Sequence, residues 1–391
     1  MVVGIDLRPL VSGKRTGVEE YVLQLLDSLF TKGSGVRFKL FFNGYNTVQF
    51  PKSFFERFDN VELIEYSIPN KLFNFSLHYF NYPKIDKLLK SVDVFFMPNI
   101  LFEAVSDDAK KIVTFHDLSF EHFKEFLTTK RRLWHIFVNP QKIARGADCI
   151  VAVSDSTKHD IIETYNIDHS KVHTIHSGII KKASEEKVTR AELREKYQLP
   201  KKYILFMGTI EPRKNLPALI EAFSAVSKKL PEYSLVVAGA PGWKMREMFT
   251  SYQERGDFDK IHFTGFIDPE DKDALFEAAS VFVYPSFYEG FGFPLLEAAE
   301  AGTPIIAGAH SSIFEIIGNA ALLIDPCNVY ELSEALYTML TSPEVRNRLT
   351  SRANKRLSMF SVEETAKRML RLITEYHEKK QYSTSEERVA I

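Results

Sequence analysis

The stretch Val281-Phe-Val-Tyr-Pro-Ser-Phe-Tyr-Glu-Gly-Phe-Gly-Phe-Pro-Leu-Leu-Glu297 predicts a strand, a glycine loop and the start of a helix. Val281–Tyr284 is a short apolar run, as buried strands are, and Leu295–Ala301 has a helical pattern. Pro294 suits the first helical turn, because its missing N–H costs nothing there. Glycines let a backbone come close to a ligand, and free N–H groups at a helix start attract phosphate.

Two carboxylates flank this loop. Glu289 lies in the loop, and Glu297 falls in the first turn of the predicted helix. Carboxylates accept hydrogen bonds from hydroxyls, so a phosphate seat between them suits a nucleotide-sugar. The spacing alone is equally compatible with a structural explanation, in which Glu297 favours the helix dipole and Glu289 is a solvated loop charge.

The same order of strand, loop and helix repeats along the chain, which predicts an α/β fold with two doubly wound parallel sheets. A charged segment, Lys181–Lys202, separates the two series, and a helix beginning at Val18 is the clearest in the first. Thr16 and Glu19 form a candidate capping box for that helix. The expected strands are Val2–Leu7, Phe38–Asn43, Val61–Tyr66, Val92–Met97, Lys111–Phe115, Cys149–Val153 and Val172–Ile175, then Tyr203–Met207, Leu235–Ala238, Ile261–Thr264, Val281–Tyr284, Pro304–Ala307 and Ala321–Ile324.

Composition narrows the class of protein. The 391 residues suggest two or three domains, and a formal net charge of −1 provides no basic field for nucleic acid. Cys149 and Cys327 are far apart in apolar surroundings, so we expect neither a disulfide framework nor a metal cluster, and a reducing cytoplasm fits. We expect no signal peptide at Met1–Leu7, and no apolar run is long enough to span a membrane.

A second motif, Phe206-Met-Gly-Thr-Ile-Glu-Pro-Arg-Lys-Asn215, follows the first strand of the second series. Ligands of open α/β sheets bind at the carboxyl ends of the strands, so Arg213 and Lys214 are placed where a pyrophosphate could lie. An arginine can also hold phosphate through two hydrogen bonds.

The two motifs together resemble glycosyltransferase family 4, a family of retaining enzymes with the GT-B architecture. Glu289-Gly-Phe-Gly-Phe-Pro-Leu-Leu-Glu297 is similar to the E-x7-E motif of that family, and Gly208–Asn215 to its phosphate-binding segment. The resemblance covers nearly the whole chain and is clearest over 203–341. One departure is Thr209, where many relatives carry an arginine after the glycine. We expect Lys214 to match the family's lysine and Arg213 to take the place of the missing arginine.

The resemblance implies two Rossmann-like domains that face each other across a cleft. Residues 1–185 would bind the acceptor and residues 186–360 the nucleotide-sugar donor, while residues 361–391 would form a helix and tail that cross back to the first domain. We expect that helix at Val362–His377, with a frayed tail after about Gln381.

The resemblance also assigns roles within the site. Glu297 would hold the ribose, Glu289 the donor sugar, and Arg213 and Lys214 the leaving diphosphate without a metal ion or other cofactor. His116, in Thr114-Phe-His-Asp-Leu118, would lie near the donor sugar. The remaining residues expected to bind the donor are Gly208, Thr209, Gly290, Phe291, Gly292, Phe293, Leu295, Gly239, Phe266, Gly13 and Gly17.

The expected function is hexosyl transfer to a saccharide or lipid-linked saccharide in cell-surface polysaccharide synthesis, and the favoured donor is GDP-mannose, which supplies mannose. UDP-glucose and UDP-N-acetylglucosamine are the other candidate donors. An epimerase of the same architecture would convert the donor without an acceptor, and a non-catalytic protein would bind a sugar-nucleotide without turnover.

Two aromatic segments are compatible with a peripheral position of the protein at the cytoplasmic face of the membrane. Thr129–Trp134, with Phe137 and Lys142, mixes basic and aromatic side chains on a predicted helix, which suits an anionic bilayer or a solvated helix face. Phenylalanines and tyrosines are also frequent early in the chain, where core packing competes with an apolar acceptor site or a membrane-facing patch. These are Phe50, Phe54, Phe55, Phe58, Phe73, Phe75, Tyr79, Phe80 and Tyr82.

Overall fold

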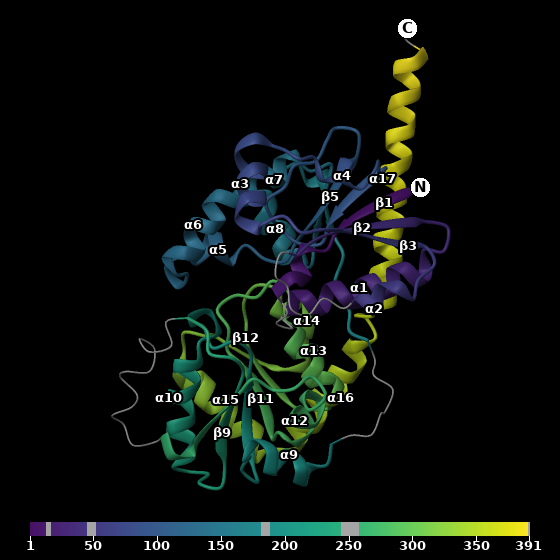
Figure 1. Cartoon of the computed structure of the whole chain (residues 1–391). Coiled ribbons are helices and arrows are strands. Elements are labelled where there is room, and N and C mark those ends of the chain that lie inside the picture. Colours follow the sequence, from purple (N-terminus) through teal and green to yellow (C-terminus); the bar gives the residue numbers. More distant parts are fainter. Residues whose placement is uncertain (13–16, 45–51, 181–187, 244–257, 390–391) are drawn as a thin grey trace. The chain divides into compact units, whose positions relative to one another are not determined.

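The computed structural model describes residues 1–12, 17–44, 52–180, 188–243 and 258–389, and Figure 1 shows the chain. The chain divides into two compact units. Unit 1 comprises Met1–Leu118, Lys130–Ile180 and Ser361–Ile391, and unit 2 comprises Ser119–Thr129 and Lys181–Phe360. The short segment Ser119–Thr129 therefore groups with unit 2, although it lies within the first domain expected from the sequence.

Unit 1 is built on a seven-stranded parallel sheet in the order β3-β2-β1-β4-β5-β6-β7. Its strands are β1 (Val2–Asp6), β2 (Arg37–Asn43), β3 (Val61–Tyr66), β4 (Val94–Met97), β5 (Lys110–Phe115), β6 (Cys149–Ala152) and β7 (Val172–Thr174). Its helices are α1 (Gly17–Lys32), α2 (Lys52–Glu56), α3 (Asn70–Phe80), α4 (Ile85–Leu88), α6 (Thr129–Val138), α7 (Pro140–Gly146), α8 (Asp155–Tyr165) and α17 (Val362–Val389).

Unit 2 contains a six-stranded parallel sheet in the order β10-β9-β8-β11-β12-β13. Its strands are β8 (Tyr203–Met207), β9 (Ser234–Ala238), β10 (Ile261–Gly265), β11 (Val281–Tyr284), β12 (Ile305–Gly308) and β13 (Leu322–Ile324). Its helices are α5 (Ser119–His122), α9 (Arg190–Tyr197), α10 (Leu216–Ser227), α12 (Lys272–Ala278), α13 (Phe293–Glu300), α14 (Ile313–Ile317), α15 (Val329–Thr341) and α16 (Pro343–Leu357).

These two sheets confirm the predicted α/β class with two doubly wound, Rossmann-like units. Every expected strand is present, with ends that differ by at most two residues. The central strands of each sheet are buried on both faces, as strands of a parallel sheet covered by helices are, whereas the edge strands β3, β7 and β10 are only partly buried. All five residues of β8 and all four of β11 are buried, and these two strands pair in the middle of the sheet of unit 2.

The helix predicted from Val18 is α1, which begins at Gly17. Its apolar residues recur at helical spacing and are buried, including Tyr21, Val22 and Leu25. The predicted capping box cannot be placed, because Thr16 lies outside the described residues.

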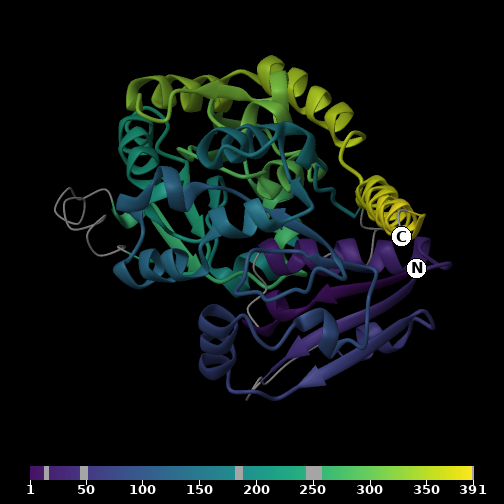
Figure 2. The same cartoon turned by 90° about the horizontal axis from the view of Figure 1, so that it is seen from above.

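The C-terminal helix α17 packs on α1 within unit 1, as Figure 2 shows, and this confirms the predicted return of the chain to the first sheet. Thr365 donates to the carbonyl of His176 at 2.8 Å, and Arg368 to that of Thr174 at 2.7 Å. The helix continues to Val389 and is longer than the expected Val362–His377. No helix among the described residues is both long and apolar enough to cross a membrane.

Gly178 allows the close approach at the start of α17. Ile179 forms a parallel bridge with Ser361, and a Cβ atom at Gly178 would lie 2.2 Å from the carbonyl carbon of Ser361. The contact is with backbone, so no side chain can rotate away to make room.

We predict that Gly178→Ala lowers the free energy of unfolding by about 2 kcal/mol, because an added methyl group at a closed contact forces the backbone to shift. Urea unfolding followed by circular dichroism measures this loss. Gly35→Ala is the matched control in unit 1, since a Cβ there meets nothing within 4 Å. Equal stabilities of the two variants would contradict the prediction.

Candidate active site

The glycine loop lies between β11 and α13 in unit 2, as predicted. Gly292 precedes the helix with φ of 101°, a backbone conformation that favours glycine, and Pro294 lies in the first turn. The helix begins at Phe293, two residues earlier than expected. Glu297 therefore lies in the second turn and not the first, because the Gly292 turn already ends the loop.

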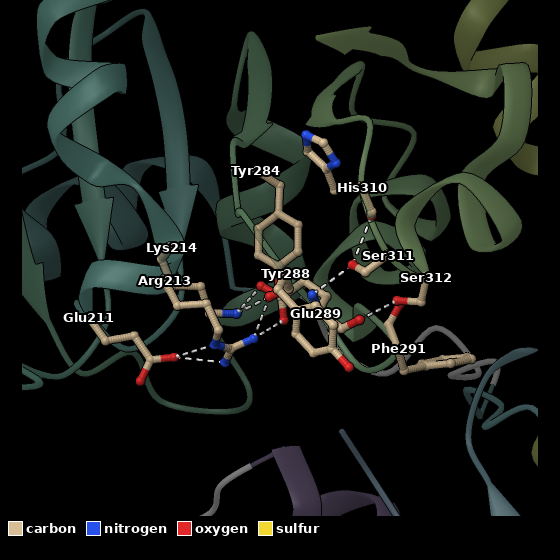
Figure 3. Close-up of polar contacts among 10 residues, drawn as sticks. All are labelled: Glu211, Arg213, Lys214, Tyr284, Tyr288, Glu289, Phe291, His310, Ser311 and Ser312. Atoms are coloured by element: carbon tan, nitrogen blue, oxygen red, sulfur yellow. Dashed lines mark hydrogen bonds and ion pairs between the residues drawn. The ribbon is translucent and has the colours of Figure 1, made fainter. Parts of the chain in front are cut away.

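The structure brings Arg213, Lys214 and Glu289 together in one network, drawn in Figure 3. Lys214 Nζ donates to Glu289 Oε1 at 2.6 Å, and Arg213 Nη1 donates to Glu289 Oε2 at 2.9 Å. All three side chains are largely shielded from solvent. The loop after β8 and the loop after β11 are thereby joined at the carboxyl edge of two adjacent strands.

Two further groups complete the network. Arg213 Nη2 also donates to Glu211 Oε1 at 2.7 Å, and Lys214 Nζ donates to the Tyr284 hydroxyl at 2.7 Å. Two carboxylates and two cations thus balance in formal charge. Balance is necessary here, since an unpaired charge is costly to bury.

The pKa values show which effect dominates at Glu289. Burial raises the pKa of this carboxyl, but Arg213 and Lys214 outweigh burial and lower the pKa to about 2. Burial lowers the pKa of the Lys214 ammonium, while the charge of Glu289 opposes that shift. Burial also raises the pKa of Tyr284 well above its usual value, and the charge of Glu289 adds to the effect, so the phenol stays protonated.

Two serines after β12 hold the Glu289 loop in place. The backbone N–H of Glu289 donates to Ser311 Oγ at 2.8 Å, and Ser312 Oγ lies 2.9 Å from the carbonyl oxygens of both Glu289 and Phe291. We did not identify Ser311 and Ser312 from the sequence. Their position just after an apolar strand, in the Gly308-Ala-His-Ser-Ser312 turn, is the signal that could have found them.

Glu297 is held by a different partner. Lys272, from α12, donates to Glu297 Oε1. We expected no Asp-x-Asp pair, but the sequence contains one, Asp271-Lys272-Asp273, and Lys272 is its middle residue. Asp271 is buried and accepts from Lys196 Nζ at 2.6 Å and from the Tyr197 hydroxyl at 2.7 Å, so this carboxylate joins α9 to the start of α12.

The strand-end glycines allow the backbones of neighbouring loops to meet. Gly208 and Gly239 both have φ of 145°, and a Cβ at Gly239 would lie 2.0 Å from the Gly208 carbonyl oxygen. Thr209 and Phe266 are exposed close to these turns in the sequence, where a ligand can reach them.

The other residues expected to bind the donor differ in what they can offer. The Phe291 side chain is buried against Phe293 and Phe360, and Leu295 is fully buried. Gly290 and Gly292 are buried with them in the loop. These positions can reach a ligand mainly through backbone groups. In unit 1, Gly17 starts α1, and Gly13 lies outside the described residues.

An aromatic cluster covers the residues just before Glu289, and we did not anticipate it from the sequence. Tyr288 lies against His122 and Phe123, with ring centroids 5.8 and 5.6 Å away, and Phe126 lies 5.9 Å from Phe287. The segment Ser119–Thr129 thus packs on the Glu289 loop inside unit 2. Its separation of more than 150 residues along the chain hid this contact.

His116 lies in unit 1, at the carboxyl end of β5. Its Nε2 is 2.9 Å from the Pro98 carbonyl oxygen, and the Tyr21 ring packs edge-on at 5.0 Å. Burial lowers the pKa of His116, so the neutral imidazole is favoured near neutral pH, with Nε2 as its donor.

A separate hollow of about 840 Å³ lies elsewhere on unit 2, lined by Ser280 and Pro304 among others. These two residues directly precede β11 and β12, so the hollow is at the amino ends of the strands. Ligands of open α/β sheets bind at the carboxyl ends, where the Arg213–Lys214–Glu289 network lies.

The chain is similar to families and proteins of known class. Residues 189–356 match the model described as glycosyl transferases group 1, and residues 15–181 match that of glycosyltransferase family 4. The O-antigen chain mannosyltransferase B of Escherichia coli is 32% identical over 277 residues, which are 69% of each chain. A serotype-specific mannosyltransferase of the same species is 30% identical over 265 residues, which are 66% of this chain but 32% of that longer protein.

Among solved structures, sucrose-phosphate synthase from Thermosynechococcus elongatus superposes with a TM-score of 0.72 at 20% identity, covering 96% of this chain and 98% of that one. The fold and site define a glycosyltransferase with the GT-B architecture. The chain belongs to glycosyltransferase family 4, and it is a hexosyltransferase that takes its sugar from a nucleotide-sugar.

The Glu289 network makes a pH-dependent contribution to stability. The folded-state pKa of Glu289 is about 2, below the ordinary value of 4.5, so its stabilisation is complete above about pH 4.5 and is lost as pH falls towards 2. A shift of this size corresponds to about 3 kcal/mol at neutral pH. We predict that the difference in unfolding free energy between wild type and Glu289→Gln shrinks as pH falls from about 5 to about 3.

Urea titrations at each pH measure this difference. Glu344→Gln, at an exposed position on α16, is the control, and its difference from wild type should be small throughout. A constant gap between wild type and Glu289→Gln would contradict the pKa assignment.

Proposed function

We propose that the chain is a retaining mannosyltransferase that uses GDP-mannose and extends a saccharide or lipid-linked saccharide in cell-surface polysaccharide synthesis. The observation that carries the proposal is the Arg213–Lys214–Glu289 network at the carboxyl edge of β8 and β11. The names of the two mannosyltransferase relatives support mannose as the sugar and a polysaccharide as the product.

In this proposal, the two cations stabilise the departing nucleoside diphosphate. Glycosyl transfer passes through a state in which positive charge develops on the sugar and negative charge on the leaving group. Fixed cations aimed at that leaving group stabilise the transition state more than the bound substrate. Lys214 has three N–H donors, and two are directed at Tyr284 and Glu289, so the third can be directed at a phosphate oxygen.

Glu289 has a double role in this proposal. Its oxygens neutralise Arg213 and Lys214 in the network described above, and in the donor complex they would accept from hydroxyls of the sugar. When the carboxylate turns towards the sugar, it releases Arg213 and Lys214 to bind the diphosphate. Binding of the sugar hydroxyls by Glu289 and binding of the diphosphate by the two cations therefore favour each other. Glu211 keeps Arg213 oriented throughout by accepting two of its hydrogen bonds. Held in this way, Arg213 would take the place of the arginine that many relatives carry at the position of Thr209.

The other assigned residues complete the donor and acceptor sites. We propose that Glu297 accepts from the ribose hydroxyls, with Lys272 holding its other side, and that the Gly290–Gly292 backbone lies against the diphosphate. As a neutral imidazole whose Nε2–H donates to the Pro98 carbonyl, His116 would accept from a hydroxyl of the reacting sugar at Nδ1. The charge stabilisation assigned to Arg213 and Lys214 requires no metal ion.

The identity of the donor is tested by thermal unfolding with GDP, GDP-mannose, UDP and UDP-glucose, with and without EDTA. A ligand at 100 times its Kd stabilises the folded state by about 2.7 kcal/mol, so the correct nucleotide should raise Tm clearly. We expect GDP and GDP-mannose to raise Tm and EDTA to have no effect. A selective shift with UDP would overturn the choice of donor and leave the glycosyltransferase class intact.

Mannose transfer itself is tested by incubating GDP-mannose with a mannose-terminated oligosaccharide and analysing the product by mass spectrometry. We predict that Lys214→Ala lowers kcat by a factor of about 100 or more with a smaller change in the Kd of GDP, because the lost donor acts mainly in the transition state. Glu297→Ala should instead raise the Kd of GDP about tenfold, through loss of hydrogen bonds to a charged acceptor.

Lys228→Ala, at an exposed position on unit 2, is the matched control for the loss of a lysine. The Tm of each variant without nucleotide separates loss of folding from loss of function. Wild-type turnover in Lys214→Ala and wild-type affinity in Glu297→Ala would overturn these two roles.

A further inference from the structure

Unit 1 has a concentrated apolar surface on α3 and α6 that the donor chemistry does not use. Nine of the sixteen exposed large apolar side chains among the described residues lie here. We call this surface the aromatic face. It consists of Leu72, Phe75, Tyr79, Phe80, Tyr82, Leu133, Trp134, Ile136 and Phe137.

Ring contacts join the two helices into one surface. His78 of α3 lies edge-on to Phe137 of α6, with ring centroids 5.7 Å apart. Phe102 continues the contact, at 6.0 Å from His78 and 6.4 Å from Trp134. The exposed rings of both helices therefore belong to one continuous patch, although more than 50 residues separate them in the sequence.

Few apolar side chains of these two helices are buried in the core. Among the residues of α3 only Phe73 and Leu77 are buried, and among those of α6 only Val138. Soluble monomers seldom leave a large contiguous apolar patch exposed unless it serves an interaction. We therefore expect the patch to bind an apolar partner.

The two segments that form the aromatic face carry side-chain charges of one sign only. Residues 70–82 and 129–142 contain no aspartate or glutamate, in a chain whose net charge is −1 overall. The same two segments carry the cations Lys71, Lys130, Arg131, Arg132 and Lys142, all exposed. Cations beside aromatic and aliphatic side chains are the combination that binds anionic lipid surfaces.

The charge also argues against a second copy of this chain as the partner. A symmetric dimer sets the same patch against itself, so each cationic rim would face another cationic rim. An anionic bilayer instead attracts the cations and accepts the rings at the level of its headgroups, where tyrosine and tryptophan are favoured.

We propose that the aromatic face and its five cations dock unit 1 on the surface of a bilayer that contains anionic phospholipid. The rings enter the headgroup region, the cations contact lipid phosphates, and no helix crosses the membrane. The proposal does not depend on the identity of the donor, so either can fail alone.

The test is flotation of the full chain with vesicles of phosphatidylcholine, with and without phosphatidylglycerol, at low and high salt. We expect binding to the vesicles with phosphatidylglycerol, weakened by salt. Each cation near the surface contributes about a fivefold change in partitioning, so Lys130→Gln with Arg132→Gln should weaken binding about 25-fold. Lys228→Gln with Lys355→Gln, two exposed lysines on unit 2, should leave it unchanged.

The apolar part is tested by Phe80→Ser, whose side chain is 69% exposed, against Tyr330→Ser at 74%. Neither ring is part of the core, so neither change should lower Tm. We expect Phe80→Ser to weaken vesicle binding about tenfold, by the loss of a buried aromatic ring, and Tyr330→Ser to have no effect.

Three results would overturn the proposal. The first is absence of flotation with either vesicle, and the second is equal binding to both vesicles regardless of salt. The third is a concentration-dependent dimer, seen by analytical ultracentrifugation without lipid, that Phe80→Ser dissociates while vesicle binding stays intact. The donor-dependent Tm shifts are measured without vesicles and are independent of all three.

Discussion

The ion pairs of Glu289 with Arg213 and Lys214 are the constraint around which unit 2 is organised at its carboxyl edge. They join the loop after β8 to the loop after β11, and these strands are neighbours in the sheet. Removing either the carboxylate or the cations would leave a buried charge without compensation. That change would lower the free energy of unfolding by more than the ion pair itself contributes. The Ser311 and Ser312 hydrogen bonds to the backbone of the Glu289 loop then fix where the carboxylate points.

The diphosphate site proposed at Arg213 and Lys214 is also stable on its own. Four buried ionisable groups balance one another, so the cations need no ligand to keep the fold. Because Glu289 holds both cations, the diphosphate of the proposed donor would have to compete with an internal carboxylate. Competition of this kind favours a ligand that offers two things at once, oxygens for the cations and hydroxyls for the carboxylate. A nucleotide-sugar has both, whereas inorganic phosphate has only the first.

The sequence predicted the fold well because each strand is a short apolar run bounded by turns, a local pattern that survives in the structure to within two residues. It also predicted that Arg213, Lys214 and Glu289 lie at the same edge of the sheet, since both loops follow strands and strand ends of a parallel sheet share an edge. It could not predict that the carboxylate binds the cations directly, because that depends on side-chain distances. Ser312 and the Ser119–Thr129 segment escaped notice for a related reason: they reach the Glu289 loop only through tertiary contacts.

The start of α13 shows how the conformation of one residue, Gly292, changes the interpretation of Glu297. The apolar spacing suggested a helix from Leu295, but Gly292 adopts positive φ and Phe293 is already helical. Glu297 therefore lies two residues further into the helix, in its second turn, where its carboxylate accepts from Lys272 and gains little from the N–H groups of the first turn. An explanation of Glu297 as a helix-dipole residue loses its basis, because that effect fades beyond the first turn. The role proposed for Glu297, accepting from ribose hydroxyls, does not depend on the helix dipole and is unaffected by this change.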